Sequence, residues 1–227
     1  MLVSYEVADR VATLTMDDGK VNALSLTMFG ELNAALDRAE RDEAVVLLQG
    51  RPGVFSAGFD LKVLRAGGPD SAAMVRAGFE LSYRLLSFPY PVVIACTGHA
   101  IAMGAFVLLS GDYRVGGTGA YKLTANEVAI GLTLPMSAVE VMRQRLTPAA
   151  FTRAAVLAET FGPENAVETG FLDRVVPPAE LSDVARAVAT SASTLDLLAH
   201  AATKARARQS SLAALRAAID ADSFNLT

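Results

Sequence analysis

The sequence has a single cysteine and no long apolar run. The first excludes a fold held by internal disulfides, and the second argues against a protein with a membrane-spanning helix. Cys96 has no partner for an internal disulfide, and its place in the apolar run 92–96 predicts a buried thiol rather than a nucleophile. This cysteine usage makes a reducing cytoplasm the expected compartment. No stretch reaches the ~18 apolar residues of a membrane-spanning helix. The first ten residues lack the basic-then-apolar order of a signal peptide.

Positive charge and histidine are also scarce. The formal net charge is −4 at pH 7, and the 227 residues include 2 histidines. A chain without an excess of basic residues is not expected to bind nucleic acid. Two isolated histidines without an acidic cluster argue against a metal site. The glycines at 116–119 have the wrong spacing for a dinucleotide fingerprint, and no phosphate-binding P-loop or Gly-x-Ser-x-Gly elbow occurs. We therefore expect no metal or redox cofactor.

Hydrophobic residues, by contrast, make up 52% of the chain, enough for a sizeable core. Alternating runs at 2–7 and 11–16 predict a β-hairpin, and a helical apolar repeat predicts a helix from Ser25 or Thr27 to about Arg41. Further strands are predicted at 44–48, 92–96, 113–115 and 172–176, and further helices at 71–87, 103–109, 137–146, 148–157, 163–168, 178–192 and 195–221.

The order of these elements predicts the fold class. Strands and helices alternate up to Pro135, which implies parallel pairing with right-handed crossovers. From Pro135 onward the pattern is mainly helical. The sequence therefore predicts an α/β fold, with one mixed core and a C-terminal helical region.

Two segments lie where a strand ends and a helix begins, at 55–62 and 97–106. Both contain small residues, which let a ligand approach the backbone closely, and the first N–H groups of the following helix face outward with partial positive charge. Two such turns side by side at the carboxyl ends of parallel strands could donate to one oxygen, as in an oxyanion hole. The alternative for the first segment is an ordinary strand-to-helix turn.

Together these segments resemble the crotonase (enoyl-CoA hydratase/isomerase) family. The first oxyanion turn of the family is similar to Ser56-Ala57-Gly58-x-Asp60-Leu61, the second to Gly98-His99-Ala100-x-x-x-Gly104, and the catalytic-glutamate loop to Asn126-Glu127-x-x-x-Gly131-Leu132. Asp112-Tyr113-Arg114 resembles a structural Asp-x-Arg, and Asn22-Ala23-Leu24 resembles a segment that borders the CoA pocket. The resemblance implies a spiral of ββα units, with an acyl-CoA-binding core at 1–180 and a helical trimerisation region at 181–227.

The resemblance also implies a role for each matched residue. The backbone N–H groups of Ala57 and Met103 would donate to the thioester oxygen, although the family usually has glycine at the second position. Glu127 would be the catalytic base. Lys62 would contact a CoA phosphate, unless it is only a solvated surface lysine. The acyl-CoA substrate, with no further cofactor, would lie along Ala23, Ser56, Ala57, Gly58, Phe59, Asp60, Leu61, Lys62, Gly104 and Phe106.

The carboxylates decide which reaction is expected. Hydratases of this family use two glutamates around a bound water; one matches Glu127, but the other falls at Phe106, whose ring cannot activate water. One carboxylate suffices to move a proton from C2 to C4 of a 3-enoyl-CoA, so Δ3–Δ2 enoyl-CoA isomerisation is predicted. Hydration despite Phe106 and non-catalytic acyl-CoA binding remain the alternatives. Glu140 is a spare acid that we expect to be structural.

Several remaining residues receive structural interpretations. His99 is expected to be structural or pocket-lining and His200 to be exposed. The basic cluster of Lys204, Arg206 and Arg208 is interpreted as a solvated face rather than an anion site.

The resemblance implies a homotrimer or hexamer. The apolar residues of the last helices would then need partners to cover them (Leu195, Leu198, Leu212, Leu215 and Ile219). Most members of the family continue with a further helix that helps cover the CoA, whereas this sequence ends at 225–227.

Overall fold

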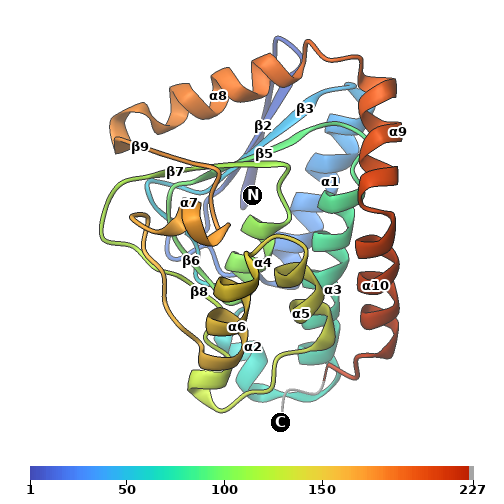
Figure 1. Cartoon of the computed structure of the whole chain (residues 1–227). Helices are drawn as coiled ribbons and strands as arrows, with labels where there is room; N and C mark the ends of the chain where they lie inside the picture. Colours follow the sequence, from blue (N-terminus) through green and yellow to red (C-terminus); the bar gives the residue numbers. More distant parts are fainter. Residues whose placement is uncertain (225–227) are drawn as a thin grey trace.

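The computed structural model describes residues 1–224 and arranges the strands in two sheets (Figure 1). The sequence end at 225–227 lies outside these described residues. The larger sheet has the order β1-β2-β3-β5-β7-β9, and only its first pair, the predicted hairpin, is antiparallel. Its strands are β1 (Val3–Ala8), β2 (Val11–Met16), β3 (Val45–Gln49), β5 (Val92–Cys96), β7 (Tyr113–Gly117) and β9 (Arg174–Val176).

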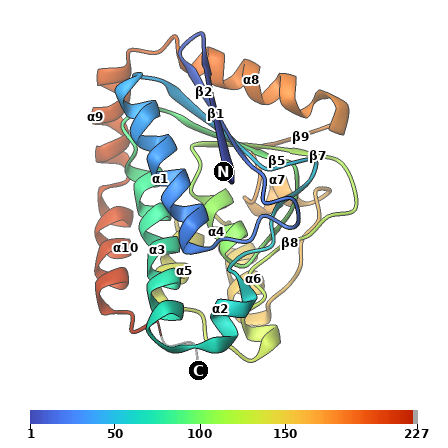
Figure 2. The same ribbon diagram turned by 180° about the vertical axis from the view of Figure 1, so that it is seen from behind.

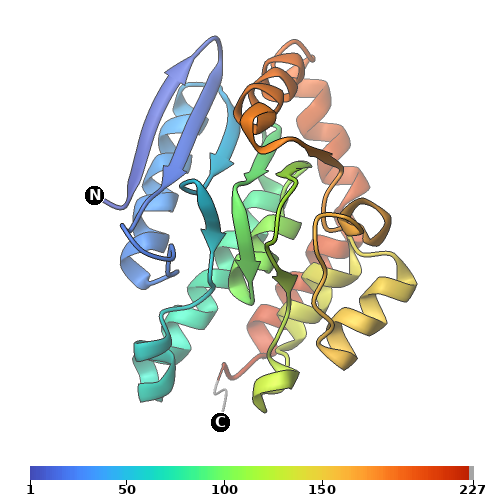
Figure 3. The same cartoon turned by 90° about the vertical axis from the view of Figure 1, so that its left-hand side faces the viewer.

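The smaller sheet consists of three parallel strands, β4 (Gly53–Ser56), β6 (Gly98–Ile101) and β8 (Leu123–Thr124). Each of them directly follows a strand of the larger sheet and precedes a helix or helical turn, so the predicted spiral of ββα units is confirmed. The segment 98–101 was predicted as part of a turn and is instead β6. Figure 3 shows the short strands next to the blue hairpin that begins the chain.

Helices of the spiral begin just after the short strands. After β4 come α2 (Leu61–Ala66) and α3 (Gly68–Ser87), after β6 comes α4 (Met103–Leu109), and after β8 come the short 3₁₀ helix η1 (Val128–Ile130) and α5 (Met136–Arg143). Helix α1 (Leu26–Arg41) precedes β3, and the Ser25 side chain caps it by accepting a hydrogen bond from the Met28 N–H. In Figure 2, α1, α3 and α10 lie side by side.

The apolar runs in β3 and β5 are explained by cover on both faces of the larger sheet. Val46, Leu48 and Ile94 belong to the main core. Val45, Leu47 and Val93 pack on the other face, under helix α8 (Leu181–Ala192). The rest of this region comprises α6 (Pro148–Leu157), α7 (Ala166–Thr169), η2 (Pro178–Glu180), α9 (Leu197–Ala207) and α10 (Gln209–Ala221).

The single helix predicted at 195–221 is wrong, because the chain bends at Arg208 between α9 and α10. At this junction the Arg208 guanidinium reaches inward, donating to the Leu86 carbonyl at 2.9 Å and lying 2.7 Å from Asp112. Both partners come from earlier parts of the chain, so a local helical pattern could not reveal the bend.

The interpretation of the basic cluster as a solvated face is wrong for Lys204 and Arg208, although Arg206 is exposed. Lys204 is 8% exposed, and its Nζ lies 2.7 Å from Asp112. Burial lowers the pKa of Lys204 to about 8. Asp112 also accepts the Val92 N–H at 2.7 Å. Lys204 and Arg208 therefore anchor α9 to Asp112 and, through Asp112, to the start of β5. His200, expected to be exposed, is half-buried beside this cluster.

Replacing Asp112 with alanine is expected to lower the free energy of unfolding by about 3 kcal/mol, because Lys204 and Arg208 would remain inside without a counter-charge. Asp220→Ala is the matched control, since the Asp220 ion pairs are largely exposed and should contribute below ~1 kcal/mol. Urea unfolding measures both losses, and equally small losses would contradict the anchoring role.

The C-terminal helices are covered partly by their own chain. Leu215 and Ile219 of α10 are buried and α10 packs against α3 and α5, so these two residues do not need a partner subunit, contrary to expectation. Leu195 and Leu198 remain 52% and 85% exposed. Among residues 1–224, no helix is long and apolar enough to cross a membrane.

Candidate active site

A cavity of about 270 Å³ lies between the two predicted turns, helix α3 and the loop that carries Glu127. Among residues 1–224, Glu127 is the only titratable residue in its lining, which is otherwise almost entirely apolar. The lining residues are Ala57, Phe59, Leu61, Leu64, Val75, Phe79, Ile101, Ala102, Phe106, Asn126, Glu127, Ile130, Leu132 and Pro135.

Glu127 is a buried carboxylate on a tight loop. Its carbonyl accepts hydrogen bonds from the N–H groups of Leu132 at 2.9 Å and Ile130 at 3.1 Å, and Gly131 returns the chain with a φ of 81°. The side chain is buried, and within the described part of the chain Oε2 has no hydrogen-bond partner. Burial raises the pKa of Glu127 to about 7. A general base that works near neutral pH needs such a pKa.

Asn22 and Ser56 hold the first turn rigidly. The buried Asn22 amide donates to the carbonyls of Met16 at 3.0 Å and Phe55 at 3.1 Å. Ser56 Oγ donates to the Asn22 carbonyl at 2.8 Å and accepts the Gly58 N–H at 3.1 Å. In the structure Ser56 therefore fixes the backbone of the turn and does not line the cavity.

The structure corrects one of the two predicted oxyanion donors. The Ala57 N–H donates to the Val21 carbonyl at 3.0 Å and is not available to a substrate, although Ala57 lines the cavity. The Phe59 N–H, by contrast, has no acceptor among residues 1–224. Gly58, with a φ of 89°, changes the direction of the backbone between them. Sequence reasoning missed Phe59, although its place directly after a glycine in the turn was a usable signal.

Met103 remains a candidate donor in the second turn. It is the first residue of α4, so its N–H precedes the helical hydrogen bonds, and no described residue accepts it. The Met103 side chain is fully buried and does not line the cavity. A Cβ added at Gly78 of α3 would lie 2.8 Å from the Met103 sulfur, so Gly78 leaves room for this side chain.

Two glycines let the turns pack directly against each other. A Cβ added at Gly58 would lie 2.7 Å from the Ile101 carbonyl oxygen and 3.3 Å from the Met103 nitrogen. A Cβ added at Gly104 would lie 2.5 Å from the Ser56 carbonyl oxygen. The free N–H groups of Phe59 and Met103 therefore come from two turns in direct contact, as an oxyanion hole requires.

Strain in the second turn falls on Ala102, which has a φ of 49° and a ψ of −121°. Residues other than glycine rarely adopt these backbone angles, so Ala102→Gly is expected to raise the free energy of unfolding by about 1 kcal/mol. Ala105→Gly, within helix α4, is the matched control and should lower it by a similar amount. Urea unfolding compares the two; destabilisation by Ala102→Gly would contradict the strain.

The other predicted site residues divide into two groups. Leu61 and Phe106 line the cavity. Asp60 caps α2 by accepting the Lys62 N–H at 2.9 Å. The Lys62 side chain is exposed. The Ala23 N–H donates to Asp18 at 2.9 Å. These three do not line the cavity.

Several lining residues were missed by sequence reasoning, mainly Val75 and Phe79 of α3 and Leu132 and Pro135 beyond Glu127. Their apolar side chains carry no local signal that separates cavity wall from core. Glu140 lies outside the cavity beside Arg143, at 3.4 Å, as expected of a structural acid.

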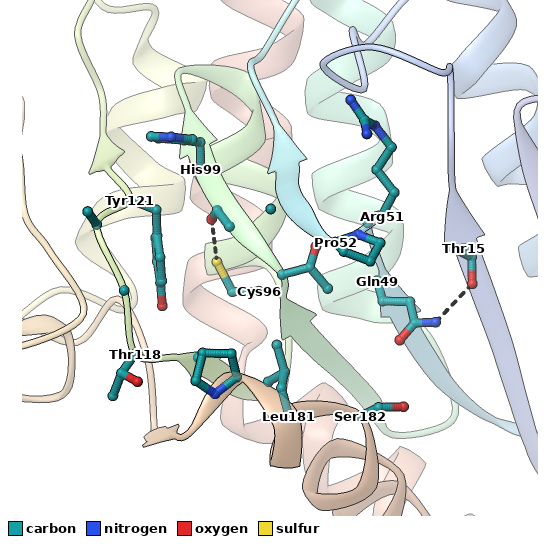
Figure 4. A pocket seen from close by; sticks show the side chains of 18 of the residues that line it. Thr15, Gln49, Arg51, Pro52, Cys96, His99, Thr118, Tyr121, Leu181 and Ser182 are labelled. Atoms are coloured by element: carbon teal, nitrogen blue, oxygen red, sulfur yellow. Dashed lines mark hydrogen bonds between the residues drawn. The ribbon is translucent and has the colours of Figure 1, made fainter.

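A larger hollow of about 600 Å³ lies at the carboxyl ends of β3, β5 and β7 (Figure 4). Cys96 donates to the Gly98 carbonyl at 3.2 Å, and burial raises the pKa of this thiol to about 12, which confirms the predicted buried cysteine. His99 lines this hollow and accepts the Lys122 N–H at 3.1 Å, also as expected. Its one acid, Asp17, lies 3.9 Å from Arg51. The hollow therefore lacks the buried unpaired base of the Glu127 cavity.

Comparisons with known proteins agree on one family. A family model described as enoyl-CoA hydratase/isomerase matches residues 6–227. Human mitochondrial enoyl-CoA delta isomerase 1 is 31% identical over 230 residues, which cover 99% of this chain and 76% of that protein. The crystal structure of an enoyl-CoA hydratase from Mycobacterium ulcerans is 52% identical, with a TM-score of 0.93 and 97% of both chains covered. An enoyl-CoA isomerase structure from Mycobacterium tuberculosis is 50% identical, with a TM-score of 0.93 and 96% of both chains covered.

Proposed function

Because the chain belongs to the enoyl-CoA hydratase/isomerase family, we propose that it converts 3-enoyl-CoA to 2-enoyl-CoA with Glu127 as its single base. The observation that supports this reaction best is the pairing of an apolar ring with one buried carboxylate, whose Oε2 has no hydrogen-bond partner in the described part of the chain. Glu127 lines the cavity together with Phe106, and no other acid of the described residues does so. Such a site has a group that can move a proton but no second acid to position water.

The proposed reaction proceeds through a dienolate. Glu127 removes a proton from C2, and the electron pair spreads over the thioester carbonyl and the C3–C4 double bond. The thioester oxygen accepts hydrogen bonds from the Phe59 and Met103 N–H groups, which are stronger in a dry cavity than in water. Protonated Glu127 then returns the proton at C4, leaving the double bond between C2 and C3. Neither a metal nor a redox cofactor is needed.

Hydration of 2-enoyl-CoA is the second candidate, because relatives of this chain also carry the name hydratase. Adding water requires a group that deprotonates it and a proton donor for C2. Phe106 is fully buried against Phe79, with ring centroids 5.7 Å apart, and offers neither.

A third candidate is an acyl-CoA-binding protein without turnover, in which Glu127→Gln would leave acyl-CoA affinity unchanged.

A product-resolved assay with 3-enoyl-CoA and 2-enoyl-CoA in parallel tests the proposal. Isomerisation is expected to be faster than hydration, and Phe106→Glu is expected to raise hydratase activity from a low starting value, because it supplies the second acid. Phe106→Gln is the matched control, since it adds polarity without a carboxylate. Rapid hydration by the wild type without isomerisation would show that the chemistry is wrongly assigned.

We also propose a homotrimer or hexamer in a reducing cytoplasm. Exposed Leu195 and Leu198 support the assembly, since they are large apolar side chains left open at the start of α9. Light scattering at micromolar concentration is expected to give the mass of three or six chains, and a stable monomer would refute the assembly. The buried Cys96 is consistent with the compartment.

A further inference from the structure

The segment that follows α10 returns to the wall of the acyl cavity. Helix α10 is held on α3 by a two-point ion pair, in which Arg216 donates to the Glu80 carboxylate at 2.9 and 2.8 Å, and by the buried Leu215 and Ile219. Figure 1 shows α10 beside α3, with the red segment that directly follows α10 turning back below α5. Residues 222–224, which we call the return segment, are therefore delivered to a defined place.

Phe224 of the return segment is the outermost of three stacked rings. It is 5% exposed and stacks on Phe79, with ring centroids 6.0 Å apart and planes inclined by 16°. Phe79 in turn packs on Phe106 at 5.7 Å, and both of these rings line the cavity. Phe224 does not touch the cavity space itself, but it occupies the volume into which Phe79 would otherwise move.

Asp222 of the same segment holds the opposite wall. Its carboxylate accepts the N–H groups of Met136 at 3.1 Å and Ser137 at 2.9 Å, and the Ser137 hydroxyl at 2.7 Å. These are the first groups of α5, directly after Pro135, which lines the cavity. The return segment thus fixes α3 on one side of the acyl cavity and the end of the Glu127 loop on the other.

The acyl cavity has a limited capacity. Its volume of about 270 Å³ corresponds to roughly nine water-sized groups of ~30 Å³. That is room for the thioester sulfur and oxygen with about seven carbons, and not for a long fatty acyl chain unless Phe79 moves. We propose that the return segment, through Phe224, sets the depth of the acyl cavity and restricts the enzyme to medium-length acyl-CoA. This proposal rests on the acyl-CoA function proposed above.

Equilibrium binding of butyryl-, octanoyl- and palmitoyl-CoA, measured by calorimetry, tests the proposal without requiring turnover. The wild type is expected to bind octanoyl-CoA more tightly than palmitoyl-CoA. In Phe224→Ala, Phe79 can move outward, so the affinity for palmitoyl-CoA relative to octanoyl-CoA is expected to rise about tenfold, and Phe224→Leu should give an intermediate rise. Tenfold corresponds to about 1.4 kcal/mol.

Phe161→Ala is the matched control, because Phe161 is also a buried ring packed against another ring, with its centroid 5.2 Å from that of Phe171, and neither residue lines the cavity. It should leave the palmitoyl-to-octanoyl ratio unchanged. If Phe224→Ala does not fold, Phe224→Leu decides the question. An unchanged ratio in the folded variant, or a wild type that prefers palmitoyl-CoA, overturns the inference. A wild type that binds none of the three acyl-CoAs overturns the proposed function instead.

Discussion

Glu127→Gln is expected to lower the turnover of 3-enoyl-CoA at least about a hundredfold, because an amide of the same shape cannot accept the C2 proton. The fold should remain intact, since the side chain is similar in size. Glu140→Gln is the matched control: Glu140 pairs with Arg143 outside the cavity, and this variant should keep wild-type turnover. Steady-state kinetics on both variants measures the difference, and equal activities would remove Glu127 from the reaction.

The pH dependence follows from the same carboxylate. Glu127 must be deprotonated to act, and burial raises its pKa to about 7, so wild-type kcat/KM is expected to rise with pH through about 7 and then level off. The ordinary pKa of this group is 4.5. The unfolded chain therefore releases the proton more readily, and wild-type stability should fall as pH rises from about 4.5 to 7.

Glu127→Gln is therefore expected to be more stable than the wild type at pH 8, by on the order of 2 kcal/mol. The difference should vanish at acidic pH, where the wild-type carboxyl is protonated in both states. Urea unfolding at several pH values measures it. A constant stability difference across pH would mean that the Glu127 carboxylate is not desolvated.

Gly58→Ala should lower turnover by about 10²–10³-fold, the usual cost of removing one oxyanion donor. The added Cβ would lie 2.7 Å from the Ile101 carbonyl oxygen, so the first turn must move and carry the Phe59 N–H with it. Gly53→Ala is the matched control. The φ of Gly53 is 84°, similar to the 89° of Gly58, but a Cβ added at Gly53 would meet open space.

Both glycine variants are expected to lose stability from backbone strain, and Gly58→Ala should lose more because its Cβ also meets the Ile101 carbonyl, whereas only Gly58→Ala should lose turnover. Urea unfolding and steady-state kinetics on the same preparations separate the two effects. If Gly53→Ala and Gly58→Ala were equally active, the contact between the two turns would have no part in the reaction.

Local patterns in the sequence predicted the larger elements of the fold. Alternation predicted the hairpin, and the apolar run 92–96 predicted a strand, because each pattern repeats over several neighbouring positions. Strands β6 and β8 could not be assigned in the same way. They span 98–101 and 123–124 and are defined by their pairing with distant strands rather than by composition. The bend at Arg208 likewise depends on Asp112, which belongs to another part of the chain.

The site shows the same division between local and distant causes. The places of Glu127 and Phe106 in the cavity lining could be predicted from motif spacing. The choice between Ala57 and Phe59 as donor could not, because it depends on which N–H is already bonded to the Val21 carbonyl. The contacts of the return segment could not be predicted either, since nothing near Asp222 or Phe224 in the sequence indicates a contact with Ser137 or Phe79.

The most direct test of the single-base mechanism follows the proton itself. With 3-enoyl-CoA carrying deuterium at C2, Glu127 should remove the label and return part of it at C4, because the cavity is apolar and Glu127 Oε2 has no hydrogen-bond partner among residues 1–224 through which to exchange it. Mass spectrometry and NMR of the product are therefore expected to show 2-enoyl-CoA with deuterium at C4. A 3-hydroxyacyl-CoA as the main product, or 2-enoyl-CoA with only solvent hydrogen at C4, would contradict proton transfer by a single carboxylate in a dry site.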